Sequence, residues 1–284
     1  MEEPTSMLQS TVLKSVHAEG VALHSGRRVS IALHPADPGS GVRFRRVDLA
    51  DSNMIEARPG NVVDARLGVR LRNEAGAEAM TVEHFLAAAS LLGLDNVLVD
   101  IDAAELPIFD GSLCQFAQMI DEAGLAVQNV ARRTIAVREA LRVEDGDRFV
   151  EIAPSSQRRI DMTIDYPAAA IGWRRVTLDP DDPTQRKRII NARTFCTLSD
   201  IEGMRARGFA LGGSLDNAIV VDGGRIINEA PLRDAEEFAL HKTADLIGDL
   251  ALVGARVEGA VTAHKTGHEL NTRLARRIAA LDPA

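Results

Sequence analysis

The segment Phe238-Ala-Leu-His-Lys-Thr-Ala-Asp-Leu-Ile-Gly-Asp249 carries the strongest structural signal in this chain. We predict a helix from Phe238 to Val253, because at about 100° of rotation per residue the apolar side chains gather on one side of it. The other side holds the polar residues His241, Lys242, Asp245 and Asp249. A His and an Asp at i and i+4 lie one helical turn apart and can reach one metal ion. The alternative is a solvated helix face that carries these residues by chance.

A second helix is predicted from Thr81 to Leu92. Its apolar residues recur at i, i+3, i+4 and i+7, namely Val82, Phe85, Leu86 and Ala89. Thr81 is a suitable N-cap. His84 follows Glu83 and points well away from the apolar stripe, whereas a His that only fills a core would point with the Phe and Leu. A core His remains the alternative when this residue is taken alone.

His268 lies at a predicted junction between a strand and a helix. The segment His264-Lys-Thr-Gly-His-Glu-Leu-Asn271 follows a strand near residues 257–263, and Gly267 marks the turn into a final helix at about 268–281. A side chain at such a junction is exposed and well oriented. A capping or surface His is the alternative.

The remaining pattern places helices late in each half of a strand-rich chain. Strands are predicted at 29–33, 96–102, 160–164 and 218–221, with a hairpin at 141–152 that turns at an Asp-Gly pair. We predict a short helix at 113–123, a polar loop at 178–188 and partly helical chain at 189–207. This is an α+β pattern. The halves resemble each other in element order but not in residue identity, which favours two related domains.

The composition excludes several classes of protein. The 284 residues suffice for one large domain or two ordinary ones, and 45% hydrophobic with 26% charged residues is typical of a globular chain. A net charge of -8 disfavours nucleic-acid binding, because the phosphate backbone would be repelled. The two cysteines give no disulfide framework, and no signal peptide or apolar run of about 20 residues is evident. We therefore expect a cytoplasmic monomer that spans no membrane, with at most transient contact with a membrane surface.

Two His and one carboxylate are typical of a hydrolytic zinc site, because they leave a fourth position open on a tetrahedral ion. Zinc lowers the pKa of a bound water to about 7 and polarises a carbonyl. A neighbouring Glu then serves as general base, and a second acid protonates the leaving amine. The chain has candidates for every part. The same three ligands could also serve Fe(II).

Four separated motifs resemble those of the UDP-3-O-acyl-N-acetylglucosamine deacetylases, in the same order. They are Thr81-Val-Glu-His84 with Leu94-Asp-Asn96, Glu105-Leu-Pro-Ile-Phe-Asp-Gly-Ser112, His241-Lys-Thr-Ala-Asp245 with Asp249, and Lys265-Thr-Gly-His-Glu-Leu-Asn271. Shorter matches are Gly20-Val-Ala-Leu-His-Ser-Gly26, Ala192-Arg-Thr-Phe195, Asp200-Ile-Glu202 and Leu211-Gly-Gly-Ser214. The resemblance covers the chain from about residue 8 to its end. The joint match outweighs the separate alternatives given above.

The resemblance implies a fold of two two-layer α+β sandwiches, each a sheet with two main helices, with the active site between them. Residues 1–128 would form the N-terminal domain and residues 129–284 the C-terminal domain. In the family an insertion in each domain adds small elements. The second insertion, about residues 197–223 here, would form an apolar passage for an acyl chain.

The resemblance also implies roles for the site residues. Zinc would be bound by His84, His241 and Asp245. Glu83 would be the general base that activates the metal-bound water. His268 would be the general acid and charge stabiliser, with Asp249 orienting it.

The implied reaction is zinc-dependent hydrolysis of the N-acetyl group of UDP-3-O-(3-hydroxyacyl)-N-acetylglucosamine, with release of acetate. It is an early committed step of lipid A biosynthesis. Thr194 would hydrogen-bond the oxyanion. Phe195 and Lys242 would hold the sugar nucleotide, since a diphosphate needs local positive charge on an acidic protein.

Three segments depart from the family pattern. Tyr166-Pro stands where a His-Pro is usual, 172–190 is polar and uncharacteristic, and 64–71 lacks threonines often found there. None of them includes Glu83 or a metal ligand. They leave open a divergent paralogue that deacetylates another acylated amino sugar. A non-catalytic protein that binds a sugar nucleotide or a lipid is the alternative from a different class.

Overall fold

The N-terminal half of the molecule is a five-stranded sheet covered by two helices. The computed structural model describes residues 8–282. The strand order is β2 (Val16–Val21), β3 (Arg28–Pro35), β9 (Val97–Ile101), β4 (Val42–Arg46) and β5 (Met54–Glu56). Helices α1 (Glu83–Leu92) and α2 (Cys114–Ala123) pack on this sheet. Phe85 of α1 joins the layers, because its ring meets Phe44 of β4 and Phe116 of α2 edge-on.

The C-terminal half repeats this architecture. Its strand order is β12 (Leu141–Asp145), β13 (Arg148–Ala153), β20 (Ala260–His264), β14 (Arg159–Asp165) and β15 (Trp173–Leu178). In both sheets one neighbouring pair is parallel, β4 with β9 and β14 with β20, and the other pairs are antiparallel. The covering helices are α5 (Glu237–Ala251) and α6 (His268–Ala279). The expected pair of sheet-plus-helix halves is therefore confirmed.

Each half has an insertion at the same place, just before its first covering helix. In the N-terminal half it is a short sheet of β6 (Val62–Asp64), β7 (Arg70–Arg72) and β8 (Glu78–Met80), entered through the 3-10 turn η2 (Pro59–Asn61). In the C-terminal half it comprises α3 (Pro183–Asn191), β16 (Phe195–Thr197), α4 (Leu198–Ala206), β17 (Ile219–Asp222) and β18 (Arg225–Ile226). The two insertions stand at equivalent places but differ in the elements that they contain.

Two further strand pairs lie outside the two main sheets. β1 (Leu8–Val12) pairs antiparallel with β10 (Leu125–Ala131), and β11 (Thr134–Ala136) pairs parallel with β19 (Arg256–Glu258). The domain boundary expected at residues 128 and 129 falls within β10. It stays a prediction.

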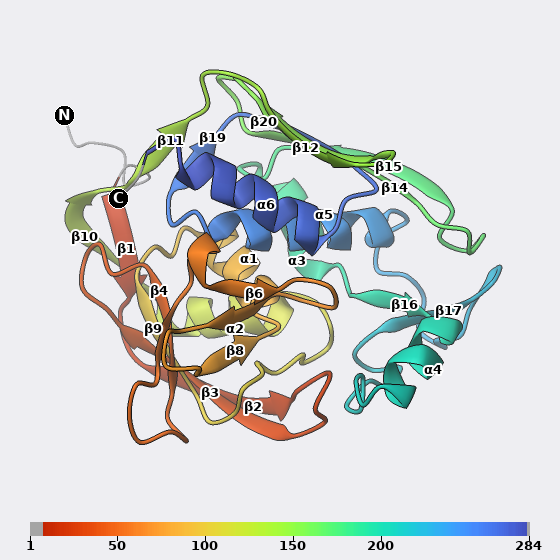
Figure 1. Ribbon diagram of the computed structural model, residues 1–284, viewed down its shortest axis with the longest axis horizontal. Coiled ribbons are helices and arrows are strands. Elements are labelled where there is room, and N and C mark those ends of the chain that lie inside the picture. The colour runs from red at the N-terminus through yellow and green to blue at the C-terminus, as the bar shows by residue number, and fades with distance from the viewer. Residues whose placement is uncertain (1–7, 283–284) are drawn as a thin grey trace.

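The helices lie in the middle of the molecule with one sheet on each side (Figure 1). At their contact, α5 comes so close to α1 that a Cβ built on Gly248 would lie 2.1 Å from the carbonyl oxygen of Glu83. Only a glycine permits this approach. Both helices are buried around most of their circumference, so their polar sides face each other and not solvent. Within residues 8–282, none of the helices has the length and apolar character needed to cross a membrane.

Several local predictions were wrong, each for a physical reason. Thr81 is not an N-cap: its φ is 56°, its hydroxyl donates to Glu105 over 3.3 Å, and α1 begins at Glu83. The polar stretch 178–188 is not all loop, because the Asp182 carboxylate caps the first turn of α3. The strand expected at 257–263 is two strands, β19 and β20, separated at Gly259.

Candidate active site

The contact between α1 and α5 brings one side chain of α1 against two side chains of α5, more than 150 positions away in the numbering. These are His84, His241 and Asp245, whose ligand atoms all lie within 4.8 Å of one another and are buried. Oδ1 of Asp245 is 3.3 Å from Nε2 of His241 and 3.8 Å from Nε2 of His84. The two imidazole rings stand nearly perpendicular, 5.1 Å apart. Each helix supplies part of the group, so neither half contains it alone.

The charge states of these groups fit a divalent cation. Burial and the neighbouring His241 lower the pKa of His84 to about 3, and burial also lowers the pKa of His241. Burial opposes ionisation of Asp245, but the charges of Lys242 and His268 help to outweigh it and hold the Asp245 pKa well below its usual range. Two neutral imidazoles and one carboxylate are the protonation states that metal binding requires.

Glu83 lies beside this group at the start of α1, and its side chain is almost fully buried. Its Oε2 accepts a hydrogen bond from the backbone N–H of Val69 over 2.9 Å. Gly68 lets the carboxylate in, because a Cβ there would stand 2.8 Å from Oε1. Burial raises the pKa of Glu83 to about 7, although the charge of His268 opposes the shift. A carboxylate with a pKa near neutrality can both take up and release a proton.

His268 reaches the site from the first residue of α6. Nδ1 of its ring lies 2.9 and 3.0 Å from the two carboxylate oxygens of Asp249. Asn271 donates to Oδ2 of Asp249 over 2.8 Å and thereby holds the carboxylate in place. Nε2 of His268 points the other way, 3.9 Å from both Glu83 Oε1 and Asp245 Oδ2.

The proton on His268 is held electrostatically. Burial disfavours the imidazolium, but the carboxylates of Asp249 and Asp245 outweigh it and raise the pKa of His268 to about 9. The ring is therefore charged at neutral pH. An acid and a base thus stand beside the same three side chains.

Lys242 and Phe195, two of the residues expected to contact substrate, also lie here. Nζ of Lys242 donates to Oδ2 of Asp245 over 2.7 Å, so its charge is turned toward a metal-ligand candidate. The ring of Phe195 stands edge-on to His241 at 6.3 Å and to Phe238 at 5.0 Å. Thr194 is fixed through its backbone N–H, which donates to the carbonyl of Gly111 over 2.7 Å.

The loop that follows β9 closes against the second insertion at Gly111. Its φ is 80°, and a Cβ there would lie 2.1 Å from the carbonyl oxygen of Asn217 and 3.1 Å from the Thr194 methyl. Both the left-handed backbone and the close approach require glycine. This explains the glycine of the Asp-Gly-Ser segment noted in the sequence.

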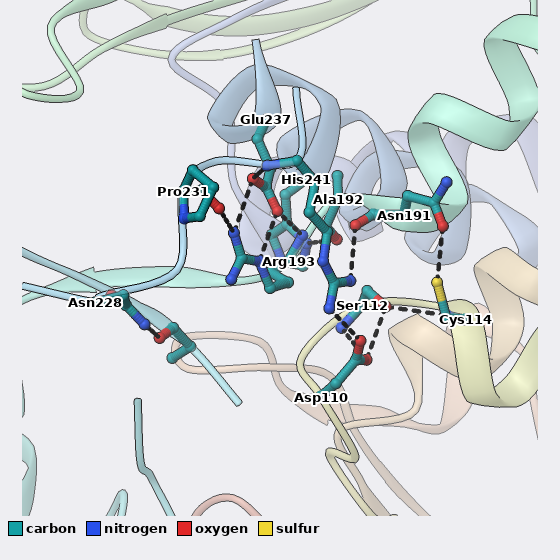
Figure 2. Close-up of polar contacts among 12 residues, drawn as sticks. Asp110, Ser112, Cys114, Asn191, Ala192, Arg193, Asn228, Pro231, Glu237 and His241 are labelled. Atoms are coloured by element: carbon teal, nitrogen blue, oxygen red, sulfur yellow. Dashed lines mark hydrogen bonds and ion pairs between the residues drawn. The ribbon is translucent and has the colours of Figure 1, made fainter. Parts of the chain in front are cut away.

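Sequence reasoning missed a buried polar network behind His241 (Figure 2). Nδ1 of His241 donates to the carbonyl of Ala192 over 3.1 Å. The next residue, Arg193, forms a buried ion pair with Glu237, with Nε 2.8 Å from Oε1. Arg233 links this network to the N-terminal half through Asp110, over 2.8 Å. The available signal was the position of Glu237 on α5, one turn before His241.

A cavity of about 220 Å³ lies next to Gly68. Its walls come from three places: the segment 64–70, the segment around Met80 and Thr81, and His24 with Arg207 and Phe209. The ring of His24 meets that of Phe209 edge-on at 5.6 Å. Through this contact the second insertion reaches across to the N-terminal half.

Comparison with known proteins gives one consistent result. Residues 9–280 match the model of a family described as UDP-3-O-acyl N-acetylglycosamine deacetylase. Curated proteins named UDP-3-O-acyl-N-acetylglucosamine deacetylase match almost throughout. One from Haemophilus influenzae (strain 86-028NP) is 42% identical over 274 residues, which are 96% of this chain and 90% of that protein. One from Pseudoalteromonas translucida (strain TAC 125) is 40% identical over 97% of this chain and 92% of its own. One from Myxococcus xanthus (strain DK1622) is 42% identical over 97% of this chain and 87% of its own.

Proposed function

The chain belongs to the UDP-3-O-acyl N-acetylglycosamine deacetylase family, and we propose that it hydrolyses the N-acetyl group of UDP-3-O-(3-hydroxyacyl)-N-acetylglucosamine, releasing acetate, as an early committed step of lipid A biosynthesis. One observation carries the proposal: two helices from different halves bring two imidazoles and a carboxylate together, with Glu83 and His268 beside them. Such a set is typical of amide hydrolysis at a metal.

We propose zinc as the metal, with His84, His241 and Asp245 as ligands. When bound, zinc polarises the amide carbonyl and lowers the pKa of a water to about 7. Glu83 then acts as general base and takes a proton from the attacking water. Its pKa of about 7 supports this role, because a base works best when its pKa is near the operating pH.

His268 is the proposed general acid. Its Nε2 donates a proton to the leaving amine nitrogen, while Asp249 holds Nδ1 and keeps the ring oriented. Water is consumed in the reaction, and the products are acetate and the free amine of the sugar. The Thr194 hydroxyl is proposed to donate to the oxyanion that forms on the amide carbonyl.

The substrate is proposed to lie between the halves. Phe195 beside His241, and Lys242 with its charge, are the proposed contacts with the sugar nucleotide. The acyl chain is assigned to about residues 197–223, which lie within the insertion of the C-terminal half. That segment exposes three large apolar side chains, Leu198, Leu211 and Leu215, whose burial against an acyl chain would be favourable.

The identity and position of Tyr166 favour testing a second substrate. It stands where a His is usual, and its ring meets Phe195 edge-on at 5.3 Å. This departure therefore lies beside the proposed substrate contact. A paralogue acting on another acylated amino sugar is accordingly the second candidate. The cytoplasmic location, the monomeric state and the domain boundary stay predictions.

The test joins metal analysis to an acetate-release assay. We expect the purified chain to hold about one zinc per molecule and to release acetate from the acylated UDP-N-acetylglucosamine faster than from other acylated amino sugars. Preference for another sugar in the panel would favour the paralogue. Bound zinc without acetate release from any of them would favour the non-catalytic binding protein and overturn the proposal.

A further inference from the structure

We propose that Glu237 is a positioning residue for His241, and that it acts through the one peptide unit joining Ala192 to Arg193. The inference rests on the proposed metal site, where His241 is a ligand. The N–H of that peptide unit donates to Oε1 of Glu237 over 3.1 Å. Its C=O accepts from Nδ1 of His241, also over 3.1 Å. Both partners lie on α5.

The spacing on α5 lets two of its side chains hold this peptide unit at both ends. Glu237 and His241 are four residues apart, so their side chains lie one above the other, about 6 Å apart along the helix. The N–H and C=O of a trans peptide unit point in opposite directions. The unit between Ala192 and Arg193 therefore spans one turn of α5, and any rotation of the unit weakens both bonds together. The hydrogen bond from the Arg193 N–H to Glu237 therefore fixes the direction in which the Ala192 carbonyl points toward His241.

Glu237 is itself held firmly. Its residue is completely buried, and its carboxylate accepts three more hydrogen bonds. They come from Arg193 Nε over 2.8 Å, Arg193 Nη2 over 3.2 Å and the backbone N–H of Arg233 over 2.6 Å. The Arg193 guanidinium also donates to the carbonyl of Pro231 over 2.9 Å. Charge-assisted bonds of this kind are shorter and stronger than neutral ones, so the carboxylate has one orientation.

The consequence lies at the other nitrogen of His241. A carbonyl only accepts hydrogen bonds, so Nδ1 carries the proton and Nε2 keeps its lone pair. Nε2 is the nitrogen that faces Oδ1 of Asp245, at 3.3 Å. Partners of this kind fix the tautomer and ring orientation of a metal-binding His, and losing them typically weakens metal affinity or activity by about 10–100-fold.

The principal test replaces Glu237→Met together with Arg193→Met. This double substitution removes the acceptor for the peptide N–H but leaves no buried charge unpaired, and apolar groups of similar volume often replace a buried ion pair without loss of stability. We expect the zinc dissociation constant, measured by chelator competition, to rise by about 10–100-fold. We also expect kcat to fall while KM stays near the wild-type value.

Two further variants separate positioning from folding. Arg193→Lys keeps a cation and the peptide N–H, so it should retain zinc affinity close to the wild-type value. Glu237→Gln is a milder change that keeps the shape of the side chain, and it should weaken zinc binding even if the double variant does not fold. Asp95→Asn is the matched control: it breaks the ion pair between Asp95, which follows α1, and Arg132, which follows β10, with an N···O distance of 2.8 Å. It should lower the melting temperature without changing zinc affinity.

A measurement on the metal-free protein makes the inference independent of zinc. Nitrogen-15 spectra of the His241 ring report which nitrogen carries the proton. We expect the Nδ1–H form in the wild type and a mixture of forms in Glu237→Gln. Unchanged ring spectra together with unchanged zinc affinity in both Glu237 variants would overturn the inference. A wild-type chain that binds no zinc would instead overturn the proposed metal site, and the ring spectra would still decide the role of Glu237.

Discussion

The two halves of this molecule share one sheet topology but contribute different chemistry. α1 and α5 occupy equivalent places, each just before the third strand of its sheet's order, β9 or β20. α1 supplies Glu83 and one imidazole, whereas α5 supplies an imidazole and two carboxylates. The repeated scaffold provides an interface between equivalent helices. The catalytic asymmetry comes from which polar side chains each helix carries.

The same contrast holds one element later. After β9 the chain runs through the loop containing Gly111 before α2 begins, whereas after β20 only three residues precede α6. The short connection places His268 at the first residue of α6, with Nδ1 on Asp249 of α5. The C-terminal half therefore holds the proposed acid as well as two ligand candidates. The N-terminal half contributes the proposed base and the third ligand candidate, His84.

The largest expected effect is a loss of turnover on substitution of Glu83, which tests the contribution of the N-terminal half. Glu83→Gln should keep zinc, because Glu83 is not in the ligand group, and should lower kcat by about 10²–10⁴-fold through loss of the general base. Zinc content and acetate release measured on the same sample would check this. Wild-type turnover by the variant would mean that the base lies elsewhere, in the C-terminal half.

The next effect concerns the contact between the halves. Gly248→Ala places a methyl group against the backbone carbonyl of Glu83 and should lower the free energy of unfolding by about 1–3 kcal/mol, since backbone cannot yield cheaply. Zinc affinity should fall in parallel, because α1 and α5 move apart. Chemical denaturation and chelator competition measure the two quantities. A stable variant with full zinc affinity would show that the close approach of the helices is not required.

A third substitution tests the C-terminal half alone. Asp249→Asn removes the carboxylate that keeps His268 charged, so activity should fall by about 10–100-fold. The pH profile of kcat/KM shows in which direction the pKa of His268 changes. His268 must be protonated, so activity is lost as pH rises through its pKa, which Asp249 raises. In the variant that pKa is lower, and the alkaline limb of kcat/KM should shift to lower pH. An unshifted limb would argue against His268 as the acid.

The smallest effect lies in the insertion that is particular to the C-terminal half. Gly203 is inside α4, and a Cβ there would meet nothing within 4 Å. Gly203→Ala should therefore raise the free energy of unfolding by about 0.5–1 kcal/mol, through helix propensity alone. Gly203→Ala and Gly248→Ala are the same substitution in two helices, and we expect them to change the free energy of unfolding in opposite directions. Thermal denaturation would show both, and equal signs would contradict the packing argument.

Much of the fold could be predicted from local patterns. Alternating apolar residues marked β3, β9, β14 and the hairpin of β12 and β13, and the period of 3.6 residues marked α1, α5 and α6 within about two residues at each end. α3 was missed because its sequence is polar and uncharacteristic, and only the cap at Asp182 and the proline after it signal its start. β15 was missed for a similar reason, since its residues 173–178 alternate weakly in an edge strand.

The site was less accessible to pattern reasoning. Two features indicated functional polar faces on the helices. They are the i, i+4 spacing of His241 and Asp245 and the position of His84 away from its apolar stripe. They did not tell which surface would cover those faces. The peptide unit between Ala192 and Arg193 left no signature at all, because any residue could supply a backbone carbonyl and N–H.

By itself the sequence determined which residues share a helix face, the order of the strongly patterned strands and helices, and the net charge, because these follow from local periodicity and composition. Only the tertiary structure decided that the polar faces of α1 and α5 lie against each other and not in water. It also decided that Glu83 has a pKa near 7 while Asp245 stays ionised. The physical reason is that both groups are buried by the contact between the halves, and that the charged neighbours of Glu83 (His268, Asp249 and Asp245) come from the opposite half, beyond the reach of any local pattern.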